Sequence, residues 1–343
     1  MRKIKVLVVE DSMLFRELLV RKLNEDEGIE VVAAARDPFE ARDMIIKYQP
    51  DVMTLDIELP RMDGIEFLRK LMPQYPLPVV MISSLSDRVF DAVNAGAVEF
   101  VAKPSSGNRK DIEEFITTEL PVKIKIASVA KLRRNAKAEA SAIQMHATPG
   151  GKCNLLAIGA STGGTEATAE LLKDLHSDLP GIVIVQHMPA GFTELYANRL
   201  NDRCELEVRE AKNGDVVRPG LALLAPGGEQ QMQVVYRDGE YKILLRKAPK
   251  VNGHCPSVDV LFHSVAKAAG KNAMGIILTG MGGDGAKGLL AMRNAGARTI
   301  GQDESTCVVY GMPKVAYECG AVEYQEKLPN IAGRVYSIMN RRP

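Results

Sequence analysis

Residues 155–172 read LLAIGASTGGTEATAELL: an apolar run, a turn of small residues, and then a helical pattern. A buried strand that leads through a tight turn into a helix is the building unit of parallel α/β sheets. The same order recurs at residues 275–290, GIILTGMGGDGAKGLL. These two segments predict that this half of the chain is an α/β domain with a doubly wound, mostly parallel sheet.

The remainder of the C-terminal half agrees with this prediction. Segment 232–245, MQVVYRDGEYKILL, predicts a β-hairpin, because the pair Asp238-Gly239 is a strong turn signal. We therefore expect residues 152–343 to form one α/β domain with an antiparallel excursion. Its predicted strands are residues 154–159, 181–186, 221–226, 274–279 and 298–302, and its predicted helices are residues 166–175, 192–200, 258–269 and 286–294.

The first 120 residues also alternate between apolar runs and helical patterns. The apolar runs are continuous and rich in β-branched residues, which is typical of strands that are covered on both faces. Five such strands with helices between them predict a (βα)5 domain over residues 1–120. The predicted strands are residues 4–9, 29–35, 52–55, 78–83 and 98–102, and the predicted helices are residues 13–24, 38–48, 64–72 and 87–95.

Residues 121–151 differ from both halves in composition. They are rich in Lys, Arg, Ala and Ser, contain few bulky apolar residues, and end in Pro149-Gly150-Gly151. This composition predicts a linker between two domains, the number that a chain of 343 residues favours.

The overall composition excludes several classes of protein. The formal net charge is only +1 and the chain has no Trp, so nothing favours nucleic-acid binding. The N-terminal apolar run stops at Glu10, too early for a signal peptide, and no run approaches the roughly 18 apolar residues that span a bilayer. The five Cys are widely spaced and form no CxxC pair, which argues against disulfides and zinc. We expect a cytoplasmic protein without membrane insertion.

Chemically suitable side chains follow four of the predicted N-terminal strands. Because parallel strands end at one edge of a sheet, we expect these side chains to lie close together. Carboxylates in such a group repel one another unless a cation such as Mg²⁺ lies among them, and one of them could then accept a phosphoryl group. For any single residue, a solvated acid or a surface lysine is the competing interpretation. The residues are Glu10, Asp11, Asp56, Ser83 and Lys103.

The segments around these residues resemble the receiver domains of response regulators. They are VLVVEDS (6–12), DVMTLDIELPRMDG (51–64), VVMISS (79–84) and FVAKP (100–104). The resemblance implies that Asp56 is the phosphorylation site and that Mg²⁺ assists there. It further implies the metal ligands Glu10, Asp11, Asp56 and the backbone carbonyl of Glu58, the hydroxyl switch Ser83, the aromatic switch Phe100 and the phosphate-binding Lys103.

The C-terminal half contains a candidate nucleophile. Gly159-x-Ser161-x-Gly163 has the spacing of a nucleophile elbow, and small residues at 159 and 163 allow a sharp turn that presents Ser161 at a helix N-terminus. The competing interpretation is a turn that binds a phosphate or a dinucleotide. The G-x-G-x-x-G spacing is not met, however, and the following strand ends in Gln186-His187 rather than in an acid that could bind ribose.

A serine nucleophile needs a histidine base. His187 follows an apolar run directly and is the best candidate, while His254, on a predicted loop, is its main rival. The other histidines are better explained as linker, surface or packing residues. They are His146, His176 and His263.

The base in turn needs a carboxylate that orients it. Asp284 lies in the second glycine-rich turn, where an ordinary helix cap is the competing interpretation, and Asp259 and Asp303 are alternatives. The order Ser161, His187, Asp284 differs from the Ser, Asp, His order of α/β-hydrolases, which argues against that fold.

The motifs of this half resemble those of the chemotaxis protein-glutamate methylesterases, the CheB family. They are IGASTGG (158–164), IVQHMP (184–189), GHCPSVDVLF (253–262) and LTGMGGDGAKGL (278–289). The resemblance implies a triad of Ser161, His187 and Asp284, with Thr162 and the backbone of Met281 near the oxyanion. It implies hydrolysis of glutamyl methyl esters on chemoreceptor cytoplasmic domains and deamidation of certain glutamines. We expect ester hydrolysis to need no cofactor.

The same resemblance implies the partners. Methyl-accepting chemoreceptors would be the substrate, a chemotaxis histidine kinase would supply the phosphoryl group, and phosphorylation would activate the hydrolase in sensory adaptation. We expect a monomer that binds no nucleic acid. Two other functions remain open at this point: a receiver joined to a nucleic-acid-binding module, and a nucleotide-dependent oxidoreductase.

Overall fold

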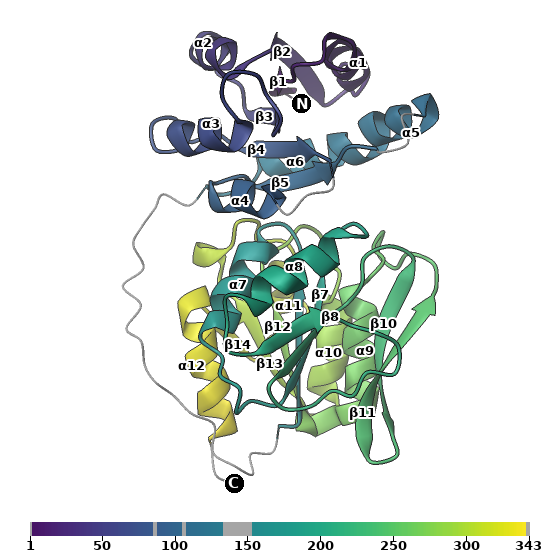
Figure 1. Ribbon diagram of the computed structural model, residues 1–343. Helices are drawn as coiled ribbons and strands as arrows, with labels where there is room; N and C mark the ends of the chain where they lie inside the picture. The colour runs from purple at the N-terminus through teal and green to yellow at the C-terminus, as the bar shows by residue number, and fades with distance from the viewer. Residues whose placement is uncertain (1, 85–87, 105–107, 133–152, 341–343) are drawn as a thin grey trace. The chain divides into compact units, whose positions relative to one another are not determined.

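The structure, a computed structural model, describes residues 2–84, 88–104, 108–132 and 153–340. The chain forms two compact units, Met1–Asn135 and Ala136–Pro343 (Figure 1). Each unit contains its own parallel sheet, so the predicted division into two α/β domains is confirmed.

The N-terminal unit is built on a five-stranded sheet in the order β2-β1-β3-β4-β5, with every neighbouring pair parallel. All residues of β3 and β4 are buried, as their continuous apolar sequences predict. The five predicted strands are confirmed. Their bounds are β1 Ile4–Val9, β2 Ile29–Ala35, β3 Val52–Asp56, β4 Val79–Ser83 and β5 Glu99–Ala102.

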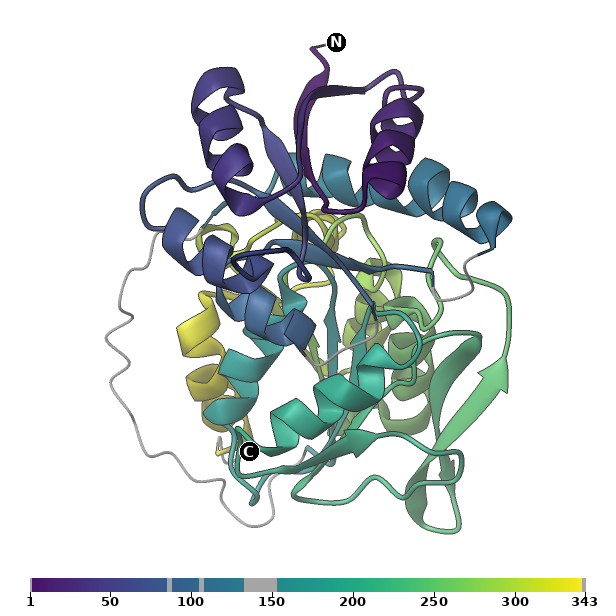
Figure 2. The same ribbon diagram turned by 45° about the horizontal axis from the view of Figure 1, so that its top comes forward.

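Helices cover both faces of this sheet. α1 lies on the same face as the C-terminal helices α5 and α6, and α2, α3 and α4 lie on the other (Figure 2). Side-chain caps fix where two helices begin: Ser12 accepts from the N–H of Phe15, and Asp37 accepts from those of Phe39 and Glu40. The bounds are α1 Met13–Leu23, α2 Pro38–Tyr48, α3 Gly64–Leu71, α4 Arg88–Asn94 and α5 Arg109–Glu114.

The end of this unit differs from the prediction. α5 continues through a π-helical turn, Phe115–Glu119, into α6, Leu120–Ser128, so the expected linker does not begin at residue 121. Leu120, Ile124 and Ala127 are fully buried because α6 packs against β3, β4 and β5. Residues 133–151 of the expected linker lie outside the described residues.

The C-terminal unit has a seven-stranded sheet in the order β14-β13-β12-β6-β7-β9-β8, again parallel throughout. The predicted hairpin is confirmed as β10 Gln230–Arg237 and β11 Glu240–Lys247, which pair with each other around Asp238-Gly239. The sheet strands are β6 Leu155–Ala160, β7 Gly181–Gln186, β8 Glu207–Glu210, β9 Leu221–Leu224, β12 Ala273–Ile277, β13 Arg298–Gln302 and β14 Tyr324–Glu326.

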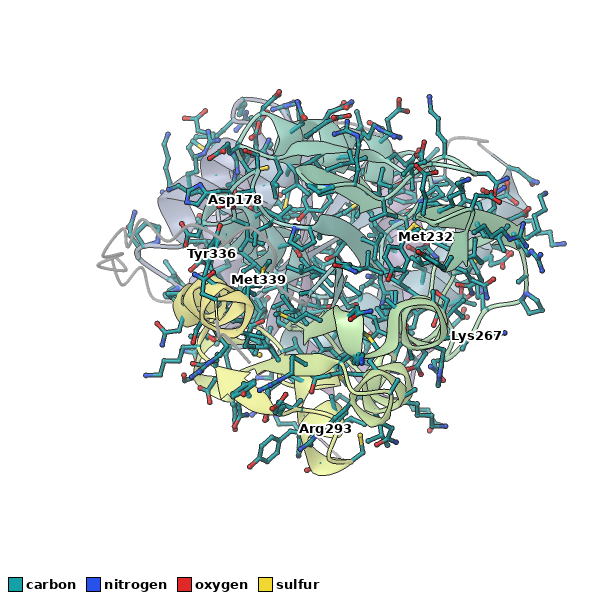
Figure 3. All side chains as sticks on the ribbon, turned by 90° about the horizontal axis from the view of Figure 1, so that it is seen from below. Asp178, Met232, Lys267, Arg293, Tyr336 and Met339 are labelled. Carbon is teal, nitrogen blue, oxygen red and sulfur yellow. The ribbon has the colours of Figure 1, made fainter. Side chains whose placement is uncertain are left out.

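Two groups of helices enclose this sheet. α9, α10 and α11 pack side by side, and α7 packs with α12 and α8. Figure 3 shows Tyr336 and Met339 of α12 on the opposite side of the view from Lys267 of α9. The bounds are α7 Gly164–Lys173, α8 Phe192–Asn201, α9 Val258–Ala269, α10 Ala286–Asn294, α11 Met312–Glu318 and α12 Leu328–Met339. Within the part of the chain that the structure describes, no helix is long and apolar enough to cross a membrane.

Candidate phosphorylation site and candidate active site

Three carboxylates gather where β1 and β3 end in the N-terminal unit. Glu10, Asp11 and Asp56 each place an oxygen within 4.8 Å of the others, and Glu10 and Asp56 are buried. The neighbouring pairing of β1 with β3 brings them together. Lys103, just after β5, places Nζ 2.5 Å from Asp56 Oδ2 and 3.0 Å from Glu10 Oε2.

One lysine does not balance this concentration of negative charge. Burial, together with the charge of Asp56, raises the pKa of Glu10 to about 7. Burial alone would lower the pKa of Lys103, but its hydrogen bond to Asp56 and the charges of both acids outweigh burial and raise it. Oxygen ligands carrying excess negative charge are what a hard divalent cation requires, so this group fits Mg²⁺.

The structure places the other predicted residues of this site on β4, on β5 and just after β3. Ser83 is the last residue of β4 and is buried; its partner in β5 is Ala102, which precedes Lys103. Phe100 is buried and meets Phe90 edge-on, with ring centroids 6.1 Å apart. Glu58 donates its backbone N–H to Asp56 Oδ1 at 3.2 Å, and the metal role of its carbonyl stays a prediction.

In the C-terminal unit, the strand order brings the three candidate triad residues to one sheet edge. β12, β6 and β7 are neighbours, and Ser161 and His187 directly follow β6 and β7. The turn after β6 is sharp because Gly163 adopts a φ of 74°, and a Cβ there would lie 2.5 Å from that of Val308. Ser161 thus sits at the N-terminus of α7.

His187 and Asp284 form a buried pair. His187 Nε2 lies 2.8 Å from Asp284 Oδ2, and the side chains are 7% and 1% exposed. Asp284 also accepts hydrogen bonds from Asn252 Nδ2, Ser257 Oγ, Val258 N and Asp259 N. Burial alone would raise the pKa of Asp284, but the hydrogen bonds from His187 and Asn252 outweigh it and hold the pKa well below its usual range.

Ser161 and His187 occupy adjacent strand ends without a hydrogen bond between their side chains. Ala160 pairs with Gln186 in the sheet, and His187 N donates to Ala160 O at 3.1 Å. Among the described residues, His187 Nδ1 is buried without a partner, whereas Nε2 binds Asp284. Nδ1 is therefore the ring nitrogen left to act as a base. Catalytic hydrogen bonds often form only when substrate is present.

The second glycine-rich turn approaches Ser161 closely. A Cβ at Gly280 would lie 2.7 Å from Cβ of Ser161, so only glycine allows this approach. The next residue, Met281, has a 43% exposed side chain, and its backbone N–H has no acceptor among the residues described. Thr162 is buried, and its carbonyl accepts from Thr279 Oγ1 at 3.0 Å.

The rival residues have other positions. His254 stacks on His187, with ring centroids 3.6 Å apart. Asp259 is buried and binds Asn252 Nδ2 and the N–H of Gly288 rather than a histidine. Asp303 caps a short 3₁₀ helix through the N–H of Ser305.

The remaining histidines lie elsewhere in the fold or outside the described residues. His176 pairs with Glu205, and His263 lies on the exposed side of α9. His146 is outside the described residues.

Sequence reasoning missed several residues that hold this site together. Gln186 donates from Nε2 to the carbonyl of Ser161 at 2.9 Å and to that of His187 at 3.3 Å, which ties the two strand ends to each other. Asn252 and Ser257 bind Asp284 from a loop more than 25 residues away in the chain. The one available signal was Asn252-Gly253, a strong turn pair.

Comparison with known proteins shows two matching families. Residues 156–335 match the family described as CheB methylesterase, and residues 6–116 match the response regulator receiver domain. The chain belongs to the CheB methylesterase family.

Two CheB relatives match along nearly their whole lengths. The protein named protein-glutamate methylesterase/protein-glutamine glutaminase 2 of Syntrophomonas wolfei is 61% identical over 346 residues, 99% of each chain. The protein-glutamate methylesterase/protein-glutamine glutaminase of Syntrophotalea carbinolica is 50% identical over 351 residues, again 99% of each. The crystal structure of the Thermotoga maritima CheB methylesterase catalytic domain is 35% identical with a TM-score of 0.53, and the match covers 54% of this chain and 98% of that one.

Proposed function

We propose that this chain is a serine hydrolase that demethylates glutamyl methyl esters on chemoreceptor cytoplasmic domains and deamidates certain receptor glutamines. Phosphorylation of Asp56 activates it. The observation that carries the proposal is the convergence of Ser161, His187 and Asp284 at three neighbouring strand ends in a CheB methylesterase domain. The receiver domain in the same chain supports the regulatory part.

The residues at the three strand ends fit the chemistry of acyl transfer. Ser161 Oγ attacks the ester carbonyl carbon while His187 Nδ1 takes its proton, and Asp284 stabilises the resulting imidazolium through Nε2. The bond to methoxide then breaks, and methanol leaves with the proton from His187. Water attacks the acyl enzyme by the same route and releases the glutamate side chain and free Ser161. With a glutamine substrate, ammonia leaves in place of methanol.

Charge develops on the carbonyl oxygen during this attack. The N–H of Met281 is available among the described residues and lies in the turn that approaches Ser161, so it can donate to that oxygen. Ser161 lies two residues before Gly163, the N-cap of α7, and backbone N–H groups at the start of a helix also favour negative charge. Thr162 shapes this region from its buried position.

The acidic group of the N-terminal domain fits a phosphoryl acceptor. Receiver domains in general are phosphorylated with the help of Mg²⁺, which neutralises charge between the acid and the phosphodonor. We assign Glu10, Asp11, Asp56 and the carbonyl of Glu58 as its ligands. Asp56 accepts the phosphoryl group, Lys103 binds its oxygens, and Ser83 and Phe100 respond by moving. The phosphodonor is a chemotaxis histidine kinase.

The most direct test of the hydrolase is methanol release from methylated receptor membranes. Ser161→Ala and His187→Ala should each lower kcat by several orders of magnitude in a folded protein, because triad members act as a unit. Asp284→Asn should be comparable or milder. A fluorophosphonate probe should label the wild type and leave Ser161→Ala unlabelled. Normal turnover by folded Ser161→Ala would refute the assignment.

Phosphorylation is tested separately with a small-molecule phosphodonor and Mg²⁺. Asp56→Asn should abolish labelling, and Lys103→Ala should lose activation even if some label remains. Label at the wild-type level in Asp56→Asn would show that another residue is modified. We also propose that the protein lies in the cytoplasm, together with the receptor domains that it demethylates, and that it is a monomer.

A further inference from the structure

A two-residue turn borders the candidate triad. Val251 and His254 exchange backbone hydrogen bonds of 2.9 Å in both directions. The residues between them, Asn252 and Gly253, have φ angles of 53° and 84°. Positive φ at both central positions is what a type I′ turn requires, and Asn-Gly is the pair that best accepts it. The backbone preferences of Asn252 and Gly253 therefore favour this turn independently of its contacts with the triad.

The first central residue of the turn binds the triad carboxylate. Asn252 Nδ2 donates to Asp284 Oδ1 at 2.7 Å and to Asp259 Oδ2 at 2.8 Å. Both hydrogens of the amide nitrogen are thus used, and they bridge two buried carboxylates. Asp259 is itself anchored, because its Oδ1 accepts from the N–H of Gly288 at 2.6 Å. This bridge holds Oδ1 of Asp284 and leaves Oδ2 directed at His187.

The last residue of the turn covers the triad histidine. The rings of His254 and His187 are 3.6 Å apart and within 8° of parallel. The carbonyl of His254 accepts from Val251 N and also from Gln231 Nε2, at 3.1 Å, so its backbone is held from two sides. One hydrogen bond to Asp284 fixes a direction for His187 but not its ring plane. The flat contact with His254 restricts that plane.

We propose that the turn Val251–His254 is a positioning element of the triad, in which Asn252 aligns Asp284 and His254 fixes the ring plane of His187. This inference rests on the proposed function, because it concerns the same base and carboxylate. Both residues act through others and need not touch substrate. Their loss should therefore lower kcat and leave KM unchanged.

The Asn252 contact can be tested with a matched pair of variants. Asn252→Gly keeps the positive φ and removes only the amide. Asp238→Gly is the control, since Asp238-Gly239 forms an equivalent turn, with φ angles of 55° and 83°, in the β10–β11 hairpin. With p-nitrophenyl acetate and with methylated receptor membranes, Asn252→Gly should lower kcat about tenfold to a hundredfold, the range for a hydrogen bond to a charged group. Asp238→Gly should stay within about twofold.

The His254 contact is tested by replacing the ring with another flat ring or with none. His254→Phe should keep kcat within about threefold of wild type, because it restores the stacked surface, and His254→Ala should lose about tenfold. If His254→Phe is as inactive as His187→Ala, His254 takes part in proton transfer and the positioning role is wrong. These variants also serve if Asn252→Gly does not fold.

A double variant tests whether Asn252 acts through Asp284 or whether its replacement disturbs the fold in general. In an Asp284→Asn background, Asn252→Gly should change kcat by less than about twofold, because its effect passes through that carboxylate. The low-field NMR signal of the His187 Nε2 proton, identified by its loss in His187→Gln, should weaken in Asn252→Gly. An undiminished loss of kcat in the double variant would overturn the proposal. If Ser161→Ala is inactive while Asn252→Gly and His254→Ala are both fully active, the positioning role of the turn is wrong and the proposed hydrolase function still holds.

Discussion

At the scale of single residues, Asp284 shows how a buried charge is kept ionised. Five donors surround its carboxylate: His187 Nε2, Asn252 Nδ2, Ser257 Oγ, and the backbone N–H groups of Val258 and Asp259. A buried carboxylate without them would take up a proton and could not stabilise an imidazolium. These contacts therefore stabilise the fold, and the proposed triad depends on the same contacts.

Because the carboxylate of Asp284 also stabilises the fold, the loss of stability caused by Asp284→Asn should depend on pH. The pKa of Asp284 lies well below its ordinary value of 3.8, so folding favours the ionised form. The resulting stabilisation is complete above about pH 4 and is lost as the pH falls towards the pKa of the folded state. At pH 7, Asp284→Asn should lower the free energy of unfolding by about 2–3 kcal/mol. Urea unfolding of residues 153–343 at pH 7 and pH 3 measures the difference, which should shrink at pH 3.

Asp303→Asn is the matched control for this measurement. Asp303 also accepts backbone and side-chain hydrogen bonds, from Ser305, but it caps a short helix at the surface. Its replacement should cost at most about 1 kcal/mol. If the loss in free energy of unfolding caused by Asp284→Asn is larger at pH 3 than at pH 7, the folded protein does not hold this carboxylate in its ionised form.

At the scale of elements, α6 extends the N-terminal domain beyond the boundary that composition predicts. Lys and Ala residues after position 120 favour a linker, yet Leu120, Ile124 and Ala127 recur at the spacing of one helix face. That face is buried against the sheet, and Val122, on the opposite face, is 55% exposed. The apolar spacing decides the structure here, and the charged residues occupy the remaining surface of the helix.

Replacing the buried residue of α6 measures this packing. Ile124→Ala should lower the free energy of unfolding of residues 1–132 by about 2–4 kcal/mol, because it removes buried methyl groups and leaves a cavity. Val122→Ala, the exposed control, should change it by less than about 0.5 kcal/mol. Urea unfolding provides both values. Equal values for the two variants would show that α6 is not part of the core.

The strength of the local signal decides which elements the sequence predicts. β3 and β4 are continuous apolar runs that are buried throughout, and such runs have few alternatives to a central strand. β8 (EVRE) and β14 (YQE) are short and polar, so only their pairing with β9 and β13 makes them strands. Tertiary context, which a single sequence does not display, supplies that pairing.

The residues of the candidate site likewise divide into those that the sequence predicts and those that it does not. Ser161, His187 and Asp284 stand beside strong strand and turn signals, so their convergence could be predicted from the rule that ligands bind at the ends of parallel strands. Asn252 and Gln186 could not, because their roles depend on which carboxylate and which carbonyls lie within hydrogen-bonding distance. Positioning residues become visible only once the loops have a conformation.

At the scale of the whole molecule, a regulatory domain and a catalytic domain share one chain. Each has its own sheet and buried core, so each can be expected to fold alone. A receiver has no evident use on a constitutive hydrolase unless it changes access to Ser161 or the binding of substrate. Phosphorylation can shift such an equilibrium only if the phosphoryl group favours one state over the other. Movement of Ser83 and Phe100 around phosphorylated Asp56 would supply that preference.

This reasoning predicts that the unphosphorylated receiver restrains the hydrolase. The isolated fragment 152–343 should demethylate receptors about five- to tenfold faster than the unphosphorylated full-length chain, and a phosphodonor should not affect it. Methanol release at low and at saturating receptor concentration separates the two ways in which a receiver could act. If it blocks access, the fragment gains at low receptor concentration. If the receiver instead helps to bind substrate, the fragment is slower than the unphosphorylated full-length chain at low receptor concentration. The receiver is then an activator and does not block the active site.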